Sequence, residues 1–261
     1  MSLRVCILGS GSSGNCIYVG SDATHILIDA GLSGQETVRR LEAVGVDIDR
    51  ICGICLTHEH DDHKAALGVL QRRLGVPLYA NRGTIEALER DAKLRQVQWT
   101  MFTNGSPFEV GDLTVEPFSV PHDSYDPVGF VVSHAGARVG IVTDMGMATE
   151  LIRARLRGCQ VVVVESNHDE QMLKDADRPW SLKQRIAGRQ GHLSNAQAGA
   201  LLAEIAGEML KVAFLAHLSA DCNRPALALK TVTKALAEAG HGHVAVKLTM
   251  AEGVSEVVVC G

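Results

Sequence analysis

The sequence predicts an α/β fold, and three observations support that prediction. Short β-rich runs alternate with helical patterns along the chain. The 261 residues are 46% hydrophobic, which is enough to bury a sizeable core. A dense cluster of histidine and aspartate directly follows one apolar run, as expected of a site at the end of a strand. The alternation by itself specifies the class α/β and no particular strand order.

The individual elements follow from the apolar periodicity in order along the chain. In the first half, β-rich runs predict strands over Val5–Leu8, Ile17–Val19, Ile26–Ile28, Ile51–Leu56, Leu113–Ser119, Val128–Val132 and Val139–Thr143. Helical spacing there predicts helices over Gly34–Val44, Lys64–Leu74 and Thr84–Ala92. In the second half the strands are Val161–Glu165, Val212–Ala216 and Val244–Leu248, and the helices are Ala196–Leu210 and Pro225–Ala239. Because no linker rich in Pro, Ser or charge divides the halves, we expect one domain over residues 1–261.

Composition narrows the class of protein. The N-terminal apolar run is short and contains Arg4, and no stretch reaches the length needed to cross a bilayer, so we expect a soluble cytoplasmic protein. The net charge of −5 argues against non-specific coating of nucleic acid but does not exclude a nucleic acid substrate. Seven scattered cysteines do not suggest a disulfide framework. Cys52 and Cys55 have the spacing of a metal knuckle but lack a second pair, so we expect both to pack in the core.

The segment Thr57-His58-Glu59-His60-Asp61-Asp62-His63 predicts a site for two metal ions. A strand that stops at Thr57 leaves His58 and His60 on one side of the chain, so both can reach one ion. Asp62 and His63 then lie at the start of the next helix, toward a second ion. Imidazole with carboxylate suits Zn²⁺, Mn²⁺ or Fe²⁺ and does not suit Ca²⁺.

This motif resembles the signature of the metallo-β-lactamase fold hydrolases, and further segments make most of the chain similar to the YycJ/WalJ branch. Those segments are Ser10–Asn15, Ile28–Leu32, Val142–Asp144, Glu165–Asp169, Gly191–Ser194 and Leu215–Ser219. The resemblance implies an αββα sandwich of two mixed sheets with outer helices. It also implies that the ligands missing from the first motif are His122, Asp144 and His217, each of which follows an apolar run. A lone histidine at a strand end is otherwise more often an ordinary surface or core residue.

The resemblance assigns further roles. Asp144 would bridge the two ions; because the zinc β-lactamases of this superfamily have a cysteine there, an antibiotic-cleaving role is disfavoured. His60 is a glutamate in the flavodiiron oxygen reductases, so a redox di-iron role loses support. Asp29 resembles an aspartate behind the metal loop that orients a ligand, although a simple turn residue is an alternative.

The expected chemistry is hydrolysis of a phosphodiester. Water held between two divalent ions has its pKa lowered toward about 7, and the ions stabilise the charge of in-line attack. We count Asp62 and His192 as the catalytic residues, with His192 as general acid or phosphate clamp; a purely structural histidine is the alternative.

Two segments are candidates for substrate contact. Residues 178–192 contain four basic side chains and Trp180 but no Asp or Glu, which suits a nucleic acid backbone and a stacked base. From this segment we predict that Arg185 contacts the substrate. Ser12 and Asn15 belong to a small-residue run that could form a phosphate-binding turn. A solvated helix face and a tight strand connection are the respective alternatives.

The leading hypothesis is a DNA exonuclease with two divalent ions, Zn²⁺ or Mn²⁺, as the resemblance implies. A small-molecule phosphodiesterase acting on cyclic phosphates, or a thioesterase of the glyoxalase II kind, is the second hypothesis. A non-catalytic metal-binding or partner protein is the third. The segment between Asp144 and His217 has no room for the large clamp domain of the β-CASP nucleases, and the chain has no obvious Gly/Pro-rich tRNA-gripping arm, which disfavours tRNA 3′ processing. The sequence does not specify the metal, the polarity of cleavage or the oligomeric state.

Overall fold

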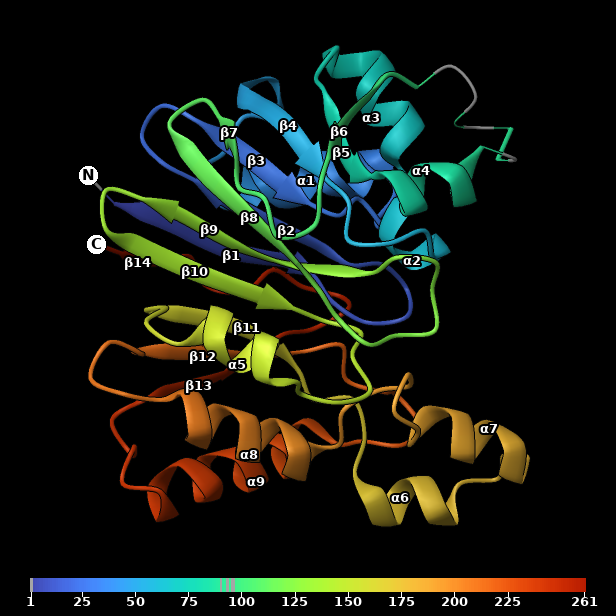
Figure 1. Ribbon diagram of the computed structural model, residues 1–261, viewed down its shortest axis with the longest axis vertical. Coiled ribbons are helices and arrows are strands. Elements are labelled where there is room, and N and C mark those ends of the chain that lie inside the picture. The colour runs from blue at the N-terminus through green and yellow to red at the C-terminus, as the bar shows by residue number, and fades with distance from the viewer. Residues whose placement is uncertain (1, 90, 93, 95–96) are drawn as a thin grey trace.

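The predicted four-layer αββα sandwich is confirmed. The computed structural model describes residues 2–89, 91–92, 94 and 97–261. Within these residues the strands form two sheets of seven, which pack face to face with helices on both outer sides (Figure 1).

The first sheet has the order β14-β1-β2-β3-β4-β5-β6. Antiparallel pairing joins β14, β1, β2 and β3, and parallel pairing joins β3, β4, β5 and β6. The bounds are β1 Leu3–Gly9, β2 Cys16–Gly20, β3 His25–Ile28, β4 Ile51–Cys55, β5 Leu78–Asn81, β6 Trp99–Phe102 and β14 Val258–Cys260.

The second sheet repeats this plan in the order β13-β12-β11-β10-β9-β8-β7. The strands β7 to β10 pair antiparallel, and β10 to β13 pair parallel. The bounds are β7 Phe108–Val110, β8 Leu113–Ser119, β9 Val128–His134, β10 Ala137–Val142, β11 Val161–Glu165, β12 Val212–Ala216 and β13 Ala245–Leu248.

The helices complete the outer layers. The first sheet is covered by α1 Gly34–Ala43, α3 Leu67–Leu74 and α4 Arg82–Leu88, and the second by α5 Glu150–Leu156, α8 Asn195–Ile205 and α9 Pro225–Glu238. The short α2 Asp61–Lys64 and the 3₁₀ turn η1 Ile48–Arg50 flank β4. The helices α6 Glu170–Asp175 and α7 Trp180–Ile186 form an arm between β11 and α8, which extends from the edge of the sandwich (Figure 1).

Three hydrophobic clusters hold the layers together. The central cluster lies between the sheets and joins residues of both, such as Ile26 and Phe130. A second cluster joins the second sheet to its helices, and a third joins the first sheet to its helices. A strand that is buried on both faces does not alternate apolar and polar residues. This explains why β11, Val161–Glu165, has four consecutive valines.

The parallel strands end at one edge, and three of them end in a strained backbone. Asp29 after β3, Asp144 after β10 and His217 after β12 have φ of 62°, 52° and 54°. Non-glycine residues seldom adopt this left-handed region, and such strain gathers at functional sites. Each strand therefore turns sharply where the predicted site begins.

Several predicted elements need correction. The predicted helix over Lys64–Leu74 is two helices, α2 and α3, because the Ala66 N–H donates to the Ala30 carbonyl (2.8 Å) between them. The predicted helix over Ala196–Leu210 ends at Ile205, since Ala206 is extended with ψ 140°. The predicted helix over Thr84–Ala92 corresponds to α4 and begins earlier, at an Asn81 cap; Arg90 lies outside the described residues.

The prediction missed β5, β6, β7, β14, α5, α6 and α7, which are all short. Helices of six or seven residues give fewer than two turns of periodicity. The expectation that both Cys52 and Cys55 pack in the core is wrong for Cys52, which is exposed on β4 while Cys55 is buried.

Candidate metal centre

A first group of imidazoles gathers beyond the end of β4. His58, His60 and His122 each offer a ligand atom, and these atoms all lie within 4.8 Å of one another. The His58 Nδ1 lies 2.9 Å from the Thr57 hydroxyl. Its Nε2 is buried without any hydrogen-bond partner among the described residues. A buried polar atom without a partner is costly, so this arrangement fits a bound cation.

A second group lies beside the first. The His63 Nε2 is 3.2 Å from Asp144 Oδ2 and 3.6 Å from Asp62 Oδ2. The His217 Nε2 is 3.7 Å from Asp62 Oδ2, and its Nδ1 is 3.1 Å from Asp144 Oδ1. Asp144 also groups with His58 and His63 within 4.8 Å. The structure therefore brings all seven predicted ligands together, with Asp144 between the two sets.

The electrostatics of the two sets differ. Burial and the neighbouring His63 hold the pKa of His58 well below its usual value, and burial lowers the pKa of His122. These imidazoles are neutral at pH 7 and can offer lone pairs to a metal ion. Burial also disfavours a charged His63, but the Asp29 and Asp144 carboxylates outweigh it and raise the pKa of His63 to about 10. The carboxylates thus favour positive charge at this position.

The Asp29 carboxylate contacts both the loop of the histidine motif and one of the predicted ligands. Its carboxylate accepts hydrogen bonds from the Thr57 N–H (2.8 Å) and from His63 Nδ1 (2.7 Å). The bond to Nδ1 leaves the His63 Nε2 facing Asp62 and Asp144.

Glu165 is a member of the site that the sequence analysis did not assign. It is fully buried at the end of β11 and accepts from His192 Nδ1 (2.7 Å) and His217 Nδ1 (2.8 Å). It also accepts from the N–H groups of Met145 and Leu193. Burial alone would raise the pKa of Glu165, but the charge of His192 and the hydrogen bonds from His192 and His217 lower it to about 2. Its position in the sequence could have indicated this role: Glu165 follows four valines at the end of β11, just as Asp144 follows the apolar strand β10.

His192 lies between the two groups at the mouth of the site. Its ring centroid is 5.2 Å from those of His122 and His217. Its side chain is 22% exposed, so one edge reaches solvent. Because Glu165 engages Nδ1, the Nε2 is left for a bound molecule.

Two residues predicted to contact the substrate, Ser12 and Asn15, lie in the loop between β1 and β2, but one is exposed and the other is buried. Ser12 is exposed and lines the hollow beside His217. Asn15, in contrast, is only 3% exposed, and its Nδ2 donates to Asp62 Oδ2 (3.0 Å). The prediction that Asn15 contacts substrate is therefore corrected, because its buried amide is hydrogen-bonded to the predicted metal ligand Asp62.

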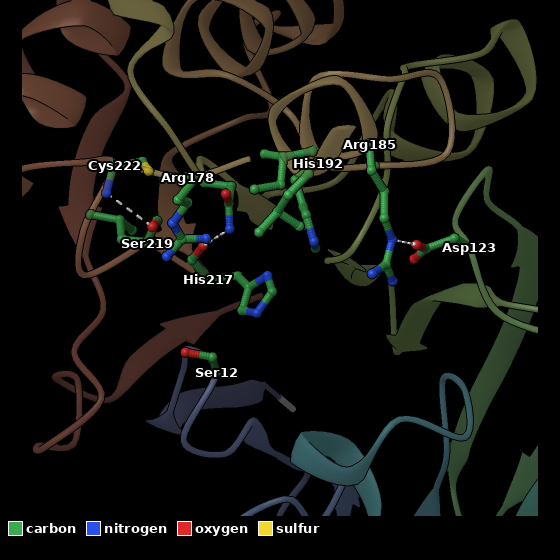
Figure 2. A pocket seen from close by; sticks show the side chains of 13 residues that line it. Ser12, Asp123, Arg178, Arg185, His192, His217, Ser219 and Cys222 are labelled. Atoms are coloured by element: carbon green, nitrogen blue, oxygen red, sulfur yellow. Dashed lines mark hydrogen bonds and ion pairs between the residues drawn. The ribbon is translucent and has the colours of Figure 1, made fainter. Parts of the chain in front are cut away.

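A pocket opens from the histidine groups toward α7. His192 and Arg185 face it from the side of the arm, with Ser12 on the opposite side and His217 between them (Figure 2). The Arg185 Nε donates to Asp123 Oδ2 (2.5 Å), and Arg178 pairs with Asp221 (2.5 Å). Apolar side chains of Leu182, Ile186 and Leu218 complete the wall. The pocket offers cationic and apolar surface directly beside the metal centre.

The two-sheet sandwich and its histidine-aspartate centre at the strand ends define a metal-dependent hydrolase. The chain belongs to the β-lactamase superfamily, since the family model described as Beta-lactamase superfamily domain matches residues 24–217. It is 37% identical over 243 residues to "Exodeoxyribonuclease YycJ" of Bacillus anthracis, covering 93% of this chain and 92% of that protein. It is 34% identical over 245 residues to "Exodeoxyribonuclease WalJ" of Streptococcus pneumoniae serotype 2, covering 93% and 91%.

A solved structure of the same fold is the metallo-β-lactamase fold protein YhfI from Bacillus subtilis. It aligns with a TM-score of 0.75 at 16% identity and covers 97% of this chain and 99% of its own. The expected resemblance, and with it a metal-dependent hydrolase of the nuclease and phosphodiesterase type, is confirmed. Among the described residues, no helix is both long and apolar enough to cross a membrane.

Proposed function

We propose that this protein is an exodeoxyribonuclease that uses two divalent ions, Zn²⁺ or Mn²⁺. The observation that carries the proposal is the pair of adjacent ligand groups, with Asp144 beside His58, His63 and His217, next to a pocket with two arginines. Two relatives that this chain matches over most of their length are both named exodeoxyribonucleases, and this supports DNA as the substrate.

In this proposal His58, His60 and His122 hold one ion, while Asp62, His63 and His217 hold the other, with Asp144 between them. The buried unpartnered Nε2 of His58 and the mixed imidazole and carboxylate donors fit such ions. Bound divalent ions polarise a phosphoryl oxygen and make water a better nucleophile at neutral pH.

The chain's own residues supply the remaining functions. Glu165 fixes His192 through Nδ1, so that the Nε2 can donate a proton to the leaving oxygen of the phosphodiester. Arg185 lies across the same hollow and can pair with a phosphate oxygen once it exchanges Asp123 for the substrate. Ser12 can donate a hydrogen bond from the facing loop. Asp29 and Asn15 keep His63 and Asp62 in place.

The deciding experiment is digestion of end-labelled single- and double-stranded DNA and RNA by protein stripped of metal and reconstituted with Mn²⁺ or Zn²⁺. We expect stepwise release of mononucleotides from DNA with at least one of the two metals. Internal fragments without mononucleotides would contradict exonuclease action. Turnover of cyclic phosphates or S-lactoylglutathione without turnover of DNA would move the protein to the small-molecule hydrolases.

The ion count needs its own measurement. Elemental analysis of the reconstituted protein should give about two ions per chain, as a two-metal site requires. A single ion in fully active protein would contradict the binuclear part of the proposal.

A cytoplasmic location belongs to the same proposal. The seven cysteines are all free, as is usual in a reducing compartment. Fractionation of cells that express the tagged protein tests this: recovery outside the cytoplasm would contradict it.

A further inference from the structure

The short helix α7 separates two pockets. Leu182, Arg185 and Ile186 line the inner pocket, which opens onto the metal centre. Trp180 and Lys183 belong to an outer pocket on the other side of the same helix. The pockets lie on opposite sides of this seven-residue helix, and an α-helix with its side chains is about 10 to 12 Å across. The two pockets are therefore within reach of one extended ligand.

The outer pocket has aromatic, cationic and buried polar parts. Trp180 lines this pocket and is 67% exposed, so its ring is accessible to a molecule bound there. Lys174 and Lys183 bring ammonium groups to the same pocket. His168 lines it as well, is only 2% exposed, and has no hydrogen-bond partner for its Nδ1 among the described residues. Since such an atom is costly to bury, it provides a ready contact for a ligand's polar edge.

The charges around the outer pocket favour a polyanion. Its lining contains two basic side chains, Lys174 and Lys183, against the single carboxylate of Glu170. Glu170, the acidic residue among the described residues of the lining, accepts a hydrogen bond from the Ser194 hydroxyl (3.1 Å). Lys183 donates to the Lys174 carbonyl (2.6 Å), which leaves its charge without a carboxylate among its recorded partners in the described residues.

We propose that the outer pocket binds a nucleotide of a single nucleic acid strand whose end lies in the inner pocket. A base would stack on Trp180 and meet His168 with its polar edge, while flanking phosphates would pair with Lys174 and Lys183. The inference rests on the proposed function for the placement of the strand end. At about 3.4 Å per nucleotide, some three nucleotides span α7, so shorter strands reach one pocket only.

The binding test uses the fluorescence of Trp180 in a Trp99→Phe background, because the chain has only two tryptophans. In EDTA, to prevent hydrolysis, an oligothymidylate of about ten nucleotides should quench the fluorescence, whereas thymidine monophosphate should do so weakly. Lys183→Ala should weaken the quenching, and the control Lys234→Ala on α9 should not. Unchanged fluorescence at saturating oligothymidylate would overturn the proposal.

The kinetic test compares long and short substrates in full-length protein loaded with metal. Trp180→Ala should raise the KM for the long strand by roughly 5- to 150-fold, the range for loss of one stacking aromatic. Hydrolysis of a dinucleotide and of bis(p-nitrophenyl) phosphate should stay unchanged. Equal loss on all three substrates would overturn the proposal. If the wild type cuts no DNA yet its Trp180 is quenched, the exonuclease proposal fails and the outer pocket stands.

Discussion

His192 and Asp144 lie near each other in the same site, yet their surroundings imply separate roles. The Asp144 side chain is buried, strained in its backbone and placed between two imidazole groups. His192 is partly exposed at the mouth and is fixed by Glu165 through a single ring nitrogen. Asp144 therefore fits a ligand and His192 fits a group that acts on substrate.

This difference predicts different outcomes for two variants. His192→Ala should keep both ions while the rate of hydrolysis falls by roughly 10²- to 10⁴-fold, as for loss of a general acid. Asp144→Ala should lose metal as well as nearly all activity. Elemental analysis together with single-turnover rates separates these effects. Loss of metal from the His192 variant would show that this histidine is a ligand.

Glu165 is expected to act by positioning, because its carboxylate binds two histidines and no solvent reaches it. The Oε1 of Glu165 accepts from both Nδ1 groups, and its Oε2 accepts from the N–H groups of Met145 and Leu193. Glu165→Gln removes the charge and points an NH₂ donor at one of these two pairs of donors, so turnover should fall about 10- to 100-fold. The pH profile of kcat should shift as well, since His192 loses its carboxylate partner. The exposed Glu150→Gln serves as control. A variant with wild-type rate and pH profile would contradict this role.

At the scale of elements, the connection after β3 fixes the position of α2. A Cβ added at Gly31 would lie 1.6 Å from the Asp62 carbonyl oxygen, while the Asn15 N–H donates to that same oxygen (2.7 Å). Two loops far apart in the sequence thus meet at Asp62 with no space between them.

Gly31→Ala should therefore displace Asp62 and weaken metal binding by at least the roughly 10-fold typical of outer-shell changes. Titration of metal into stripped protein measures the effect, and circular dichroism checks that the variant folds. Gly207→Ala is the matched control, because no atom of the described residues lies within 4 Å of its added Cβ. Unchanged affinity in folded Gly31→Ala would contradict the argument.

Helix α1 is tied to β1 by charge. The Arg40 Nη1 donates to the Leu8 carbonyl (2.6 Å), and its Nε donates to Glu36 (2.5 Å). Hydrogen bonds from Arg39 and Arg40 lower the pKa of Glu36 from 4.5 to about 2. The ionised Glu36 thus stabilises the fold above pH 4.5, and this contribution is lost as the pH falls toward 2.

Glu36→Gln should lower the free energy of unfolding at pH 7 by about 1 kcal/mol, since the pair is partly open to solvent. The difference from wild type should shrink at pH 3, where the wild-type carboxylate gains less from folding. Urea unfolding at both pH values measures this, with the exposed Glu42→Gln on the same helix as control. A difference that is equal at both pH values would contradict the assignment.

At the scale of the whole molecule, the two sheets share one core and one site. The central cluster contains residues of both halves, and the ligand groups draw on both halves as well. We infer that residues 1–261 form a single cooperative domain, because neither sheet can expose its inner face without losing this cluster.

One unfolding transition is therefore expected. In Trp180→Phe protein, Trp99 fluorescence reports on the first sheet and circular dichroism on the whole chain, and their urea midpoints should coincide. Phe130→Ala in the central cluster should lower the free energy of unfolding by about 3 to 5 kcal/mol and shift both midpoints together. The half-exposed Met209→Ala should change stability little. Two separated transitions would divide the chain into two domains.

The sequence by itself determined the long buried strands and the ligand-type residues at their ends. Apolar runs such as Val161–Glu165 are recognisable locally, because a strand buried on both faces needs no partner to show its pattern. His58, His60 and His63 are recognisable for a related reason: their spacing is a local property of one loop. The resemblance then supplied Asp144 and His217 by their order along the chain.

Only the tertiary structure decided what depends on contacts between distant loops. Glu165 lies in the site because β11 and β12 end side by side, which brings it to His217. Asn15 does not face the pocket, because its amide is hydrogen-bonded to Asp62. The sequence showed only a segment rich in basic residues, whereas the structure shows that the two faces of α7 line two different pockets. Periodicity records how a segment is buried, whereas a side chain's partner is set by which strand ends pack together, and that is a property of the whole fold.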